Sequence, residues 1–473
     1  MAGYVLCERG EGVASREQSK GTLYGTFAII VLVLALSNMS QTACNSMLVA
    51  IGADYGISED TGQWLTTAYM LVIGITVPAV AFLSKRYSNR TLLIAACGLF
   101  LAGCAIDALA PSFPALLAGR ILQALCAGIA MPLVQGYASM RFPSHLRATG
   151  MGIAGIALGF APNMGPVLGG VFVSCGDWRM LFAVTAVLSL ILLVATLIVA
   201  PREKPGAQAS LDMASLMLST LGFGSMLLGI SNASTAGLTS PLLWAPLTVG
   251  VLFVLLFFLR QRRASMPLIN LGIFSSKRFD SILAIQSCMM GSYLGITLIL
   301  PLFIQNLWGG SSMDAGMAYI PATVLALILN PLSGILADKL GPRPICIAGG
   351  AFLAAGSIGM VFMDAQTSMA YCVAFHTLRC AGISCLMGPT NAYALGGLGP
   401  ITMDASSFLA LMRQVCAALG TAVMVLLIAQ LNLLSAAGAI PAALPYQAAF
   451  GFSAVVATAA FLLIVVFVRN DRR

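Results

Sequence analysis

Residues 155–170 read Gly155-Ile-Ala-Leu-Gly-Phe-Ala-Pro-Asn-Met-Gly-Pro-Val-Leu-Gly-Gly170. Small or helix-breaking positions recur in this stretch every three or four residues and so share one face of a helix. They are Gly155, Gly159, Pro162, Pro166 and Gly169 or Gly170. In water each glycine costs about 1 and each proline about 3 kcal/mol relative to alanine. In lipid the backbone keeps its hydrogen bonds, which predicts a bent helix that is either a packing seam or a hinge between moving parts.

Composition defines the broad class of protein. Hydrophobic residues make up 59% of the 473-residue chain and charged residues only 8%, whereas globular domains carry about 25% charged residues. A water-soluble core cannot hide this much apolar surface, so we expect a polytopic membrane protein. The formal net charge is +8, but the basic residues lie between apolar runs and form no patch, so no nucleic-acid partner is expected.

No cofactor or metal site is expected. The twelve cysteines are scattered without a Cys-x-x-Cys pair, and the two histidines are His145 and His376. Buried thiols that pack as small hydrophobic side chains explain this pattern better than a metal centre or a disulfide framework.

Fourteen apolar runs approach the roughly 20 residues that a helix needs to cross a bilayer. They lie near residues 24–47, 62–83, 91–110, 113–135, 148–173, 180–200, 212–232, 241–259, 280–304, 315–337, 344–363, 368–394, 404–432 and 447–468. Basic residues gather in alternate gaps, such as Lys85 and Arg90 after the second run, while the opposite gaps hold acidic residues and one basic residue, Arg179. By the positive-inside rule both termini are cytoplasmic.

An internal repeat indicates two related halves. Residues 81–90 close the second run and residues 334–343 close the tenth, an offset of 253 (334 − 81). Gln123 and Arg379 open similar segments at an offset of 256 (379 − 123). We therefore expect two parallel six-helix halves with a substrate cavity between them and two inserted helices. The expected parts are a cytoplasmic tail 1–23, a first half 24–200, a linker with two extra transmembrane helices 201–278, a second half 279–468 and a cytoplasmic tail 469–473.

Several motifs follow one another along the chain. The first spans carry Asn45-Ser-Met-Leu-Val-Ala-Ile51, Gln63-Trp64 and Thr67-Ala-Tyr69, and later spans carry Arg120-Ile-Leu-Gln123, Ala161-Pro-Asn-Met-Gly-Pro-Val-Leu-Gly-Gly170, Trp178-Arg179-Met-Leu-Phe182 and Gly334-x-x-x-Asp338-Lys339-x-Gly341-x-Arg343. In this order they resemble the major facilitator superfamily, in particular its fourteen-span drug/proton antiporter branch, over nearly the whole chain. The resemblance implies an all-α major facilitator fold and multidrug-efflux-like export. The hinge or seal of the exporter motif would comprise Gly155, Gly159, Pro162, Gly165, Pro166, Gly169 and Gly170.

The chain departs from the pattern of that branch at important positions. Ser40 stands where the branch usually has an acidic residue, and Lys85 stands where its first loop motif has an aspartate. Ala124 replaces a glycine after Gln123. The usual proton site of the branch is therefore not supported by the sequence.

Charged residues inside spans are rare because each costs several kcal/mol, so they are the first candidates for function. Arg120 is either a strut between helices or, as the resemblance favours, part of the substrate and proton pathway. Arg379 has the same two interpretations, and Arg413 is expected to be structural. Acidic residues are expected only in loops and at span ends, and His376 is expected to pack against its neighbours rather than carry protons.

The loop after the tenth span is expected to act as a gate. Asp338 can accept hydrogen bonds from the N-terminus of the next helix or pair with Arg343, which would hold one state of a rocker switch. Lys85 cannot accept such bonds, so we expect an asymmetric gate in which the Asp338 side is dominant. The full set of gating candidates is Asp338, Lys339, Gly341, Arg343, Arg86 and Arg90.

Polar residues on several spans are candidates for a cavity wall, although most of them can simply bond helix to helix. Together with Arg120 and Arg379 the pathway candidates are Gln41, Asn45, Tyr69, Gln123, Asn163, Gln286, Tyr293, Gln305, Asn330 and Asn391. Arginines without acids predict an electropositive cavity, which favours neutral or anionic amphiphiles over cations.

The leading hypothesis is a plasma-membrane exporter of small amphipathic molecules that works by alternating access, driven by an ion or substrate gradient. We expect a monomer in the lipid bilayer and no enzyme, because neither a nucleophile nor a phosphate-binding loop is present. One alternative is a transporter of a specific neutral, anionic or lipid-like substrate without proton coupling through the first span. The other is a membrane receptor or scaffold that transports nothing.

Overall fold

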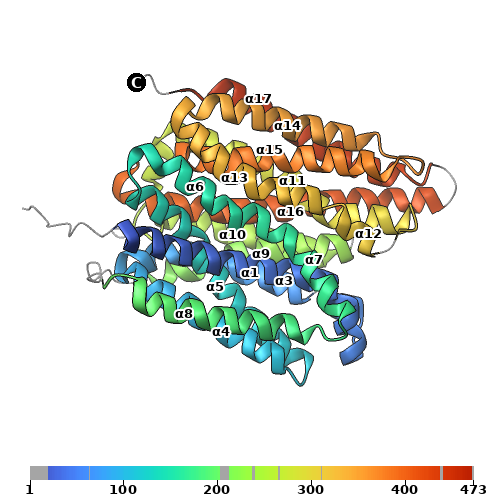
Figure 1. Ribbon diagram of the computed structural model, residues 1–473, viewed down its shortest axis with the longest axis horizontal. Coiled ribbons are helices and arrows are strands. Elements are labelled where there is room, and N and C mark those ends of the chain that lie inside the picture. Colours follow the sequence, from blue (N-terminus) through green and yellow to red (C-terminus); the bar gives the residue numbers. More distant parts are fainter. Residues whose placement is uncertain are drawn as a thin grey trace, which may run out of the picture.

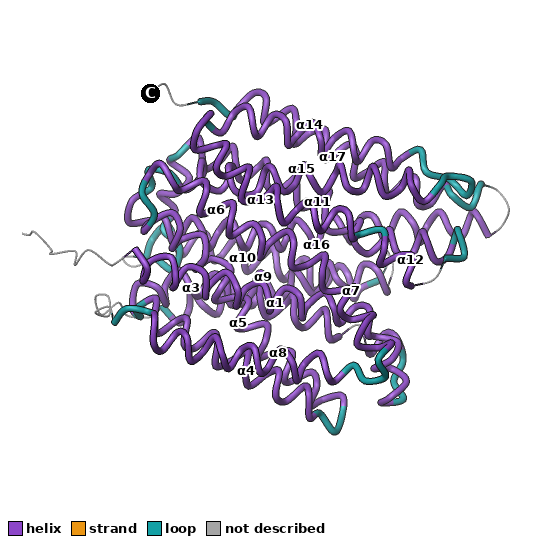
Figure 2. The backbone as a smooth tube through the Cα atoms, in the orientation of Figure 1, coloured by secondary structure: helices purple, strands orange, loops and turns teal. Residues whose placement is uncertain are grey.

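The computed structural model describes residues 20–62, 64–202, 212–236, 240–264, 267–310, 312–436 and 440–470. Most of the two expected cytoplasmic tails and Gln63 of the first motif lie outside these residues. Within them the chain is helical and contains no strand. Figures 1 and 2 show the helices side by side along the long axis of the molecule, joined by loops and turns.

The helices form two halves and an inserted pair. The first half comprises α1 (Lys20–Tyr55), α2 (Glu59–Gly62), α3 (Trp64–Arg86), α4 (Asn89–Leu109), α5 (Phe113–Arg141), α6 (Arg147–Gly155), α7 (Ala161–Ser174) and α8 (Arg179–Val199). The inserted pair is α9 (Met213–Ala236) and α10 (Pro241–Gln261). The second half comprises α11 (Lys277–Asn306), α12 (Ser312–Met317), α13 (Ile320–Leu340), α14 (Pro342–Val361), α15 (Met369–Leu395), α16 (Thr402–Ala436) and α17 (Leu444–Phe467). Fourteen helical segments are long and apolar enough to cross a membrane, which confirms the predicted number of spans.

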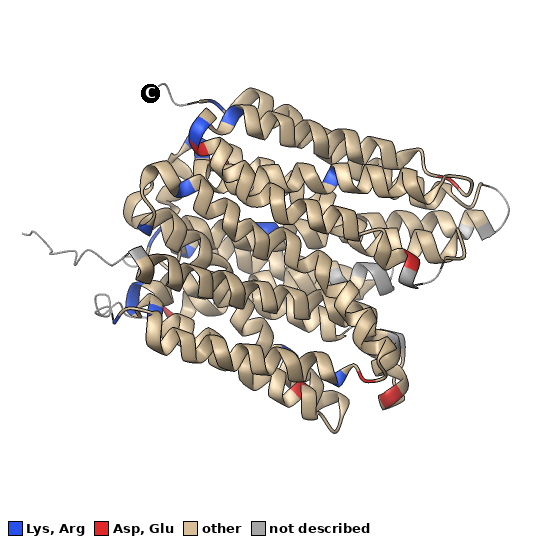
Figure 3. Ribbon diagram, viewed as in Figure 1, with Lys and Arg blue, Asp and Glu red and all other residues tan. Residues whose placement is uncertain are grey.

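Charge separates the two ends of the bundle. Most lysines and arginines lie at the end where the described chain finishes, at the left of Figure 3, and most acidic residues lie at the opposite end. We call these the basic end and the acidic end. This separation is the pattern on which the predicted cytoplasmic orientation of the basic end rests.

The fifth span contains a local change of helix type. Between α6 and α7, residues Ile156–Phe160 form one π-helical turn, in which the Ala161 N–H donates to the Ile156 carbonyl five residues earlier. Pro162 follows directly and has no N–H to donate, so the ordinary pattern of hydrogen bonds cannot continue through it. A π-helical turn followed by a proline therefore stands at the place where the sequence predicts a bend.

The glycines of the fifth span contact two different neighbours. A Cβ at Gly155 would lie 2.5 Å from Oδ1 of Asn330 on α13, in the second half. A Cβ at Gly169 would lie 2.5 Å from the Ala43 carbonyl of α1, in the same half, and one at Gly165 would overlap Thr42. Gly155 therefore faces the second half, whereas Gly165 and Gly169 face α1 within the first half.

The inserted pair is attached to both halves through one helix. α9 packs closely against α10, where a Cβ at Gly250 would lie 2.5 Å from the Met226 backbone nitrogen. α9 also contacts α3 of the first half and α16 of the second. It therefore covers the side of the bundle where α3 meets α16.

Candidate functional site

Arg120 lies at the centre of a buried polar cluster in the first half. Its Nη1 donates to Oε1 of Gln123 at 2.8 Å and to the side chain and carbonyl of Ser40 at 3.1 and 3.2 Å. Its guanidinium lies 4.4 Å from the centre of the Tyr69 ring, which gives a cation–π contact. The side chain is fully buried, so α1, α3 and α5 are joined here by a cation that water does not reach.

Gln123 extends this cluster to a carboxylate that sequence reasoning missed. Its Nε2 donates to Oδ2 of Asp107 on α4 at 2.8 Å, and its Oε1 accepts from the Ser40 hydroxyl at 2.9 Å. Asp107 lies near the end of its span, as expected, but it is fully buried. An acid therefore lies in the same buried cluster as Arg120, which the prediction of arginines without acids did not include. The sequence did contain a signal for a buried acid, because Asp107 follows a largely apolar run and has no basic residue close to it in the chain.

Arg379 occupies a similar position in the second half with fewer partners. Its Nη2 donates to the Tyr293 carbonyl at 2.7 Å, and its guanidinium lies 4.7 Å from the Tyr293 ring centre. The side chain is fully buried, and its Nε and Nη1 find no hydrogen-bond partner among the described residues. A buried guanidinium with unused donors is suited to hold an oxygen-rich or anionic group.

Tyr293 connects Arg379 to the exporter motif of the fifth span across the interface between the halves. The Asn163 Nδ2, on α7, donates to the Tyr293 hydroxyl at 3.2 Å. Both side chains are buried. The structure thus brings three of the predicted pathway residues, Asn163, Tyr293 and Arg379, into one contiguous group that spans the two halves.

The other predicted pathway residues are dispersed. Gln286 bonds within the second half to Asn391 at 2.8 Å, and Asn330 donates to the Ala326 carbonyl of its own helix at 2.7 Å. Asn45 is exposed and accepts from Thr66, Gln305 is half-buried, and Gln41 offers its carbonyl to Arg120 at 3.5 Å. These contacts match the interpretation in which such residues bond helix to helix.

His376 is a packed core residue. It is fully buried, its ring centre lies 4.6 Å from that of Tyr319, and its Nε2 lies 3.5 Å from the Cys380 sulfur. Such surroundings agree with the expected packing role.

Asp338 joins the two halves at the basic end. Its carboxylate accepts from the backbone N–H groups of Ala148 and Thr149 at 3.1 and 2.7 Å and from the Thr149 hydroxyl at 2.6 Å. These groups form the N-terminus of α6 in the first half, where a negative charge is stabilised by unpaired N–H groups and the helix dipole.

The predicted partners of Asp338, the N-terminus of α14 and Arg343, are therefore wrong. The Arg343 N–H donates instead to Asn470, and the turn before it needs glycine because Gly341 has φ 89°.

Lys85 forms a matching contact with reversed charge. Its Nζ lies 2.9 Å from Oδ1 of Asp404, a buried residue in the first turn of α16. Each half thus contributes a side chain from the last turn of a helix, α3 or α13, that contacts the first turn of a helix in the other half. The dominance of Asp338 in an asymmetric gate stays a prediction. We call the Asp338 contact and the Lys85–Asp404 pair the two latches.

The remaining gating candidates are placed differently from Asp338 and Lys85. Both Nη atoms of Arg90 donate to carbonyls at the end of α8, Ala200 at 2.6 Å and Leu197 at 2.7 Å, which is a contact within the first half. Arg86 and Lys339 are exposed. Additional bonds between halves near the latches come from Ser406 to the Pro132 carbonyl at 2.6 Å and from Arg413 to the Gln135 amide oxygen at 2.8 Å once that amide is turned to face it.

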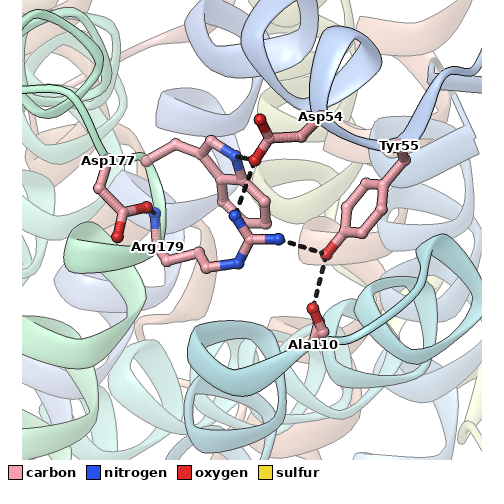
Figure 4. Close-up of polar contacts among 6 residues, drawn as sticks. Asp54, Tyr55, Ala110, Asp177 and Arg179 are labelled. Atoms are coloured by element: carbon pink, nitrogen blue, oxygen red, sulfur yellow. Dashed lines mark hydrogen bonds and ion pairs between the residues drawn. The ribbon is translucent and has the colours of Figure 1, made fainter.

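At the acidic end a polar cluster ties the first half together (Figure 4). Oδ2 of Asp54 accepts from the Arg179 guanidinium at 2.7 Å and from the Trp178 indole at 2.9 Å. Arg179 also donates to the Tyr55 hydroxyl, which donates in turn to the Ala110 carbonyl. These bonds fix the ends of α1 and α4 to the start of α8. The bonds from Arg179 and then Trp178 also hold the pKa of Asp54 below its ordinary value.

Two six-helix halves that are joined by polar contacts at one end, each with a fully buried arginine, have the architecture of a membrane transporter. The chain belongs to the Major Facilitator Superfamily, whose sequence profile matches residues 30–421.

Two curated relatives from Bacillus subtilis (strain 168) support this assignment. The chain is 33% identical over 388 residues to the uncharacterized MFS-type transporter YcnB, covering 82% of each chain. It is 32% identical over 409 residues to the lincomycin resistance protein LmrB, covering 85% of each. The crystal structure of the human organic anion transporter MFSD10 has the same fold, with a TM-score of 0.65, 14% identity and coverage of 93% of this chain and 99% of that one. These findings confirm the family resemblance predicted from the motifs.

The acidic-end cluster gives a prediction with a pH dependence. An aspartate that is free in the unfolded chain has a pKa of about 3.9. Since the folded pKa of Asp54 is lower, its contribution to stability is complete above about pH 4 and is lost as the pH falls through the folded value. Asp54→Asn should lower the Tm of the purified protein by a few degrees at pH 7, because an exposed pair contributes about 1 kcal/mol or less. Once the pH falls below the folded pKa of Asp54 the two proteins should melt together, and a difference that stays constant across the whole acid range would contradict this assignment.

Proposed function

We propose that this protein exports small amphipathic molecules across the cell membrane by rocker-switch alternating access, as a monomer driven by an ion or substrate gradient. The observation that carries the proposal is the pair of latches at the basic end. Each connects the last turn of a helix in one half to the first turn of a helix in the other, so both must break when the halves rock apart at that end. The two latches hold the halves together at the basic end, so we expect them to break when substrate binds from that side.

The division of the chain belongs to the same proposal. We propose that residues 24–200 and 279–468 move as the two halves and that residues 201–278 link them. The Asp54 cluster supports rigid movement of the first half, because it fixes the ends of three helices to one another.

The substrate class follows from the group around Arg379. Its unused N–H groups and the Tyr293 and Asn163 side chains offer donors and an aromatic face, and no carboxylate among the described residues bonds to this arginine. Such a site suits neutral or anionic amphiphiles. The resistance function named for the relative LmrB supports export of drug-like molecules by this chain as well.

Transport into inside-out vesicles with an imposed pH gradient tests the function. We expect accumulation of Nile red, which is neutral, or anilinonaphthalene sulfonate, which is anionic, at least tenfold above that of ethidium, a cation. Ser40→Asp places a second acid beside Arg120 and should raise ethidium transport. Ethidium as the preferred substrate of the wild type would contradict the charge argument, and a single transported metabolite would favour the specific-transporter alternative. Transport of nothing would favour a receptor or scaffold.

Asp338→Asn should reduce transport at least tenfold while the amount of protein in the membrane stays normal. The neutral amide loses the charge that the N-terminus of α6 stabilises and can no longer accept on both atoms. Asp364→Asn, in a loop at the acidic end, is the matched control. Unchanged transport by Asp338→Asn would remove this latch from the mechanism.

The second latch can be tested by exchanging its charges. Lys85→Asp leaves the buried Asp404 facing another acid, and loss of a partner from a buried pair typically costs about 3–5 kcal/mol. We expect transport to fall at least tenfold in Lys85→Asp and to recover in part in the double variant Lys85→Asp/Asp404→Lys. A single variant with normal transport would show that Asp338 works alone.

A further inference from the structure

Asp107 is a buried acid that has no part in the mechanism proposed above. It lies in the last turn of α4, has no exposed surface, and its Oδ1 has no hydrogen-bond partner among the described residues. Buried carboxylates are normally paired directly or fully hydrogen-bonded. One oxygen of Asp107 is thus free to take up a proton.

The neighbouring amide identifies which oxygen is free. The Gln123 Oε1 faces two donors, Arg120 Nη1 at 2.8 Å and Ser40 Oγ at 2.9 Å, so its Nε2 must face Asp107. Oδ2 therefore remains an acceptor whether or not the carboxyl group carries a proton. A proton would bind at Oδ1.

The backbone opposite Asp107 leaves room for this atom. A Cβ at Gly119 of α5 would overlap Oδ1 of Asp107, so the glycine makes the space that the carboxylate occupies. By contrast, a Cβ at Gly98, earlier on α4, would meet nothing within 4 Å.

Few ionisable groups face Asp107. The helices that contact α4 contribute Arg120 from α5 and Cys44 from α1, and α4 itself contributes Cys104. α3 presents Tyr69 beneath Arg120, and α8 presents the Thr185 hydroxyl to Cys104. Arg120 is the charged member of this set, and the Gln123 amide stands between it and Asp107.

We propose that Asp107 is the proton-binding residue of this transporter and replaces the acid that is absent at Ser40. The proposal rests on the gradient-driven export proposed above. A proton arriving from the acidic end forms an O–H bond with a lone pair of Oδ1 and makes the carboxyl group neutral. Release at the basic end breaks that same bond and returns the proton to water.

The contacts also supply a route from protonation to movement. Neutralising Asp107 alters the charge that Gln123 and Arg120 balance, and both of these residues bond to Ser40 on α1. The next turn of α1 carries Ala43, whose carbonyl packs against Gly169 of the exporter stretch. A change in the Ser40 contacts therefore acts on the helix against which the fifth span packs.

The first test does not depend on transport. Infrared difference spectra of the purified protein between acid and alkaline pH should contain a carboxylic C=O band that is absent in Asp107→Asn and kept in the control Asp364→Asn. Gly119→Ala, which crowds Oδ1, should move the pH midpoint of that band by at least one pH unit, while Gly98→Ala should not. An unchanged band in Asp107→Asn would overturn the proposal.

The second test separates proton coupling from transport in inside-out vesicles with anilinonaphthalene sulfonate. Accumulation of the dye driven by a pH gradient should be at least tenfold lower in Asp107→Asn than in the wild type. Exchange of the dye across the vesicle membrane without a gradient should be unchanged. Accumulation by Asp107→Asn at the wild-type level would overturn the proposal. If the wild type moves no dye while the infrared band depends on Asp107, export is refuted and the proton site stands.

Discussion

The hydrogen bonds between the Asp338 carboxylate and the first N–H groups of α6 are the contact on which the arrangement of the two halves depends. A helix inside a membrane protein satisfies its own backbone except at its ends, so a helix start is the place where another element can bind through the backbone. Lys85 stands 253 residues before Asp338 (338 − 85) and makes the corresponding contact with Asp404, so that here the base ends one helix and the acid begins the other. The same geometry is thus kept with reversed polarity. Because both contacts join helix ends, the halves can separate there without unfolding either half.

The buried polar groups of the two halves are not equally satisfied. Arg120 bonds to Ser40 and Gln123 and lies over Tyr69, and through Gln123 it reaches a carboxylate. Arg379 bonds to one carbonyl at short distance and leaves two nitrogens without partners. A cation buried with unused donors is costly unless another molecule can supply the missing acceptors. Among the described residues the two halves of one repeat therefore offer different chemistry, with an arginine–amide–carboxylate network in the first and an arginine that bonds only to backbone carbonyls in the second.

The sequence predicted the features that depend on local patterns. The apolar runs predicted fourteen spans, and the residue types at Arg120, Gln123 and Asp338 marked positions that the structure shows in polar contacts. It could not predict contacts that depend on how helices are placed. The partner of Asp338 is 190 residues away in the chain, and that of Lys85 lies in another half, so the nearer Arg343 was the wrong choice. Asp107 was missed because its sequence position, at the end of a span, gives no measure of how deeply neighbouring helices cover it.

The position of α9 makes the two seams between the halves unequal. The halves touch each other directly both where α6 meets α13 and where α3 meets α16, and at the second of these seams α9 contacts both helices as well. A helix attached to both halves cannot follow both when they separate. In the rocker-switch motion proposed above, we therefore expect the contacts of α9 to limit displacement along the α3–α16 seam, so that the larger displacement between the halves occurs along the α6–α13 seam.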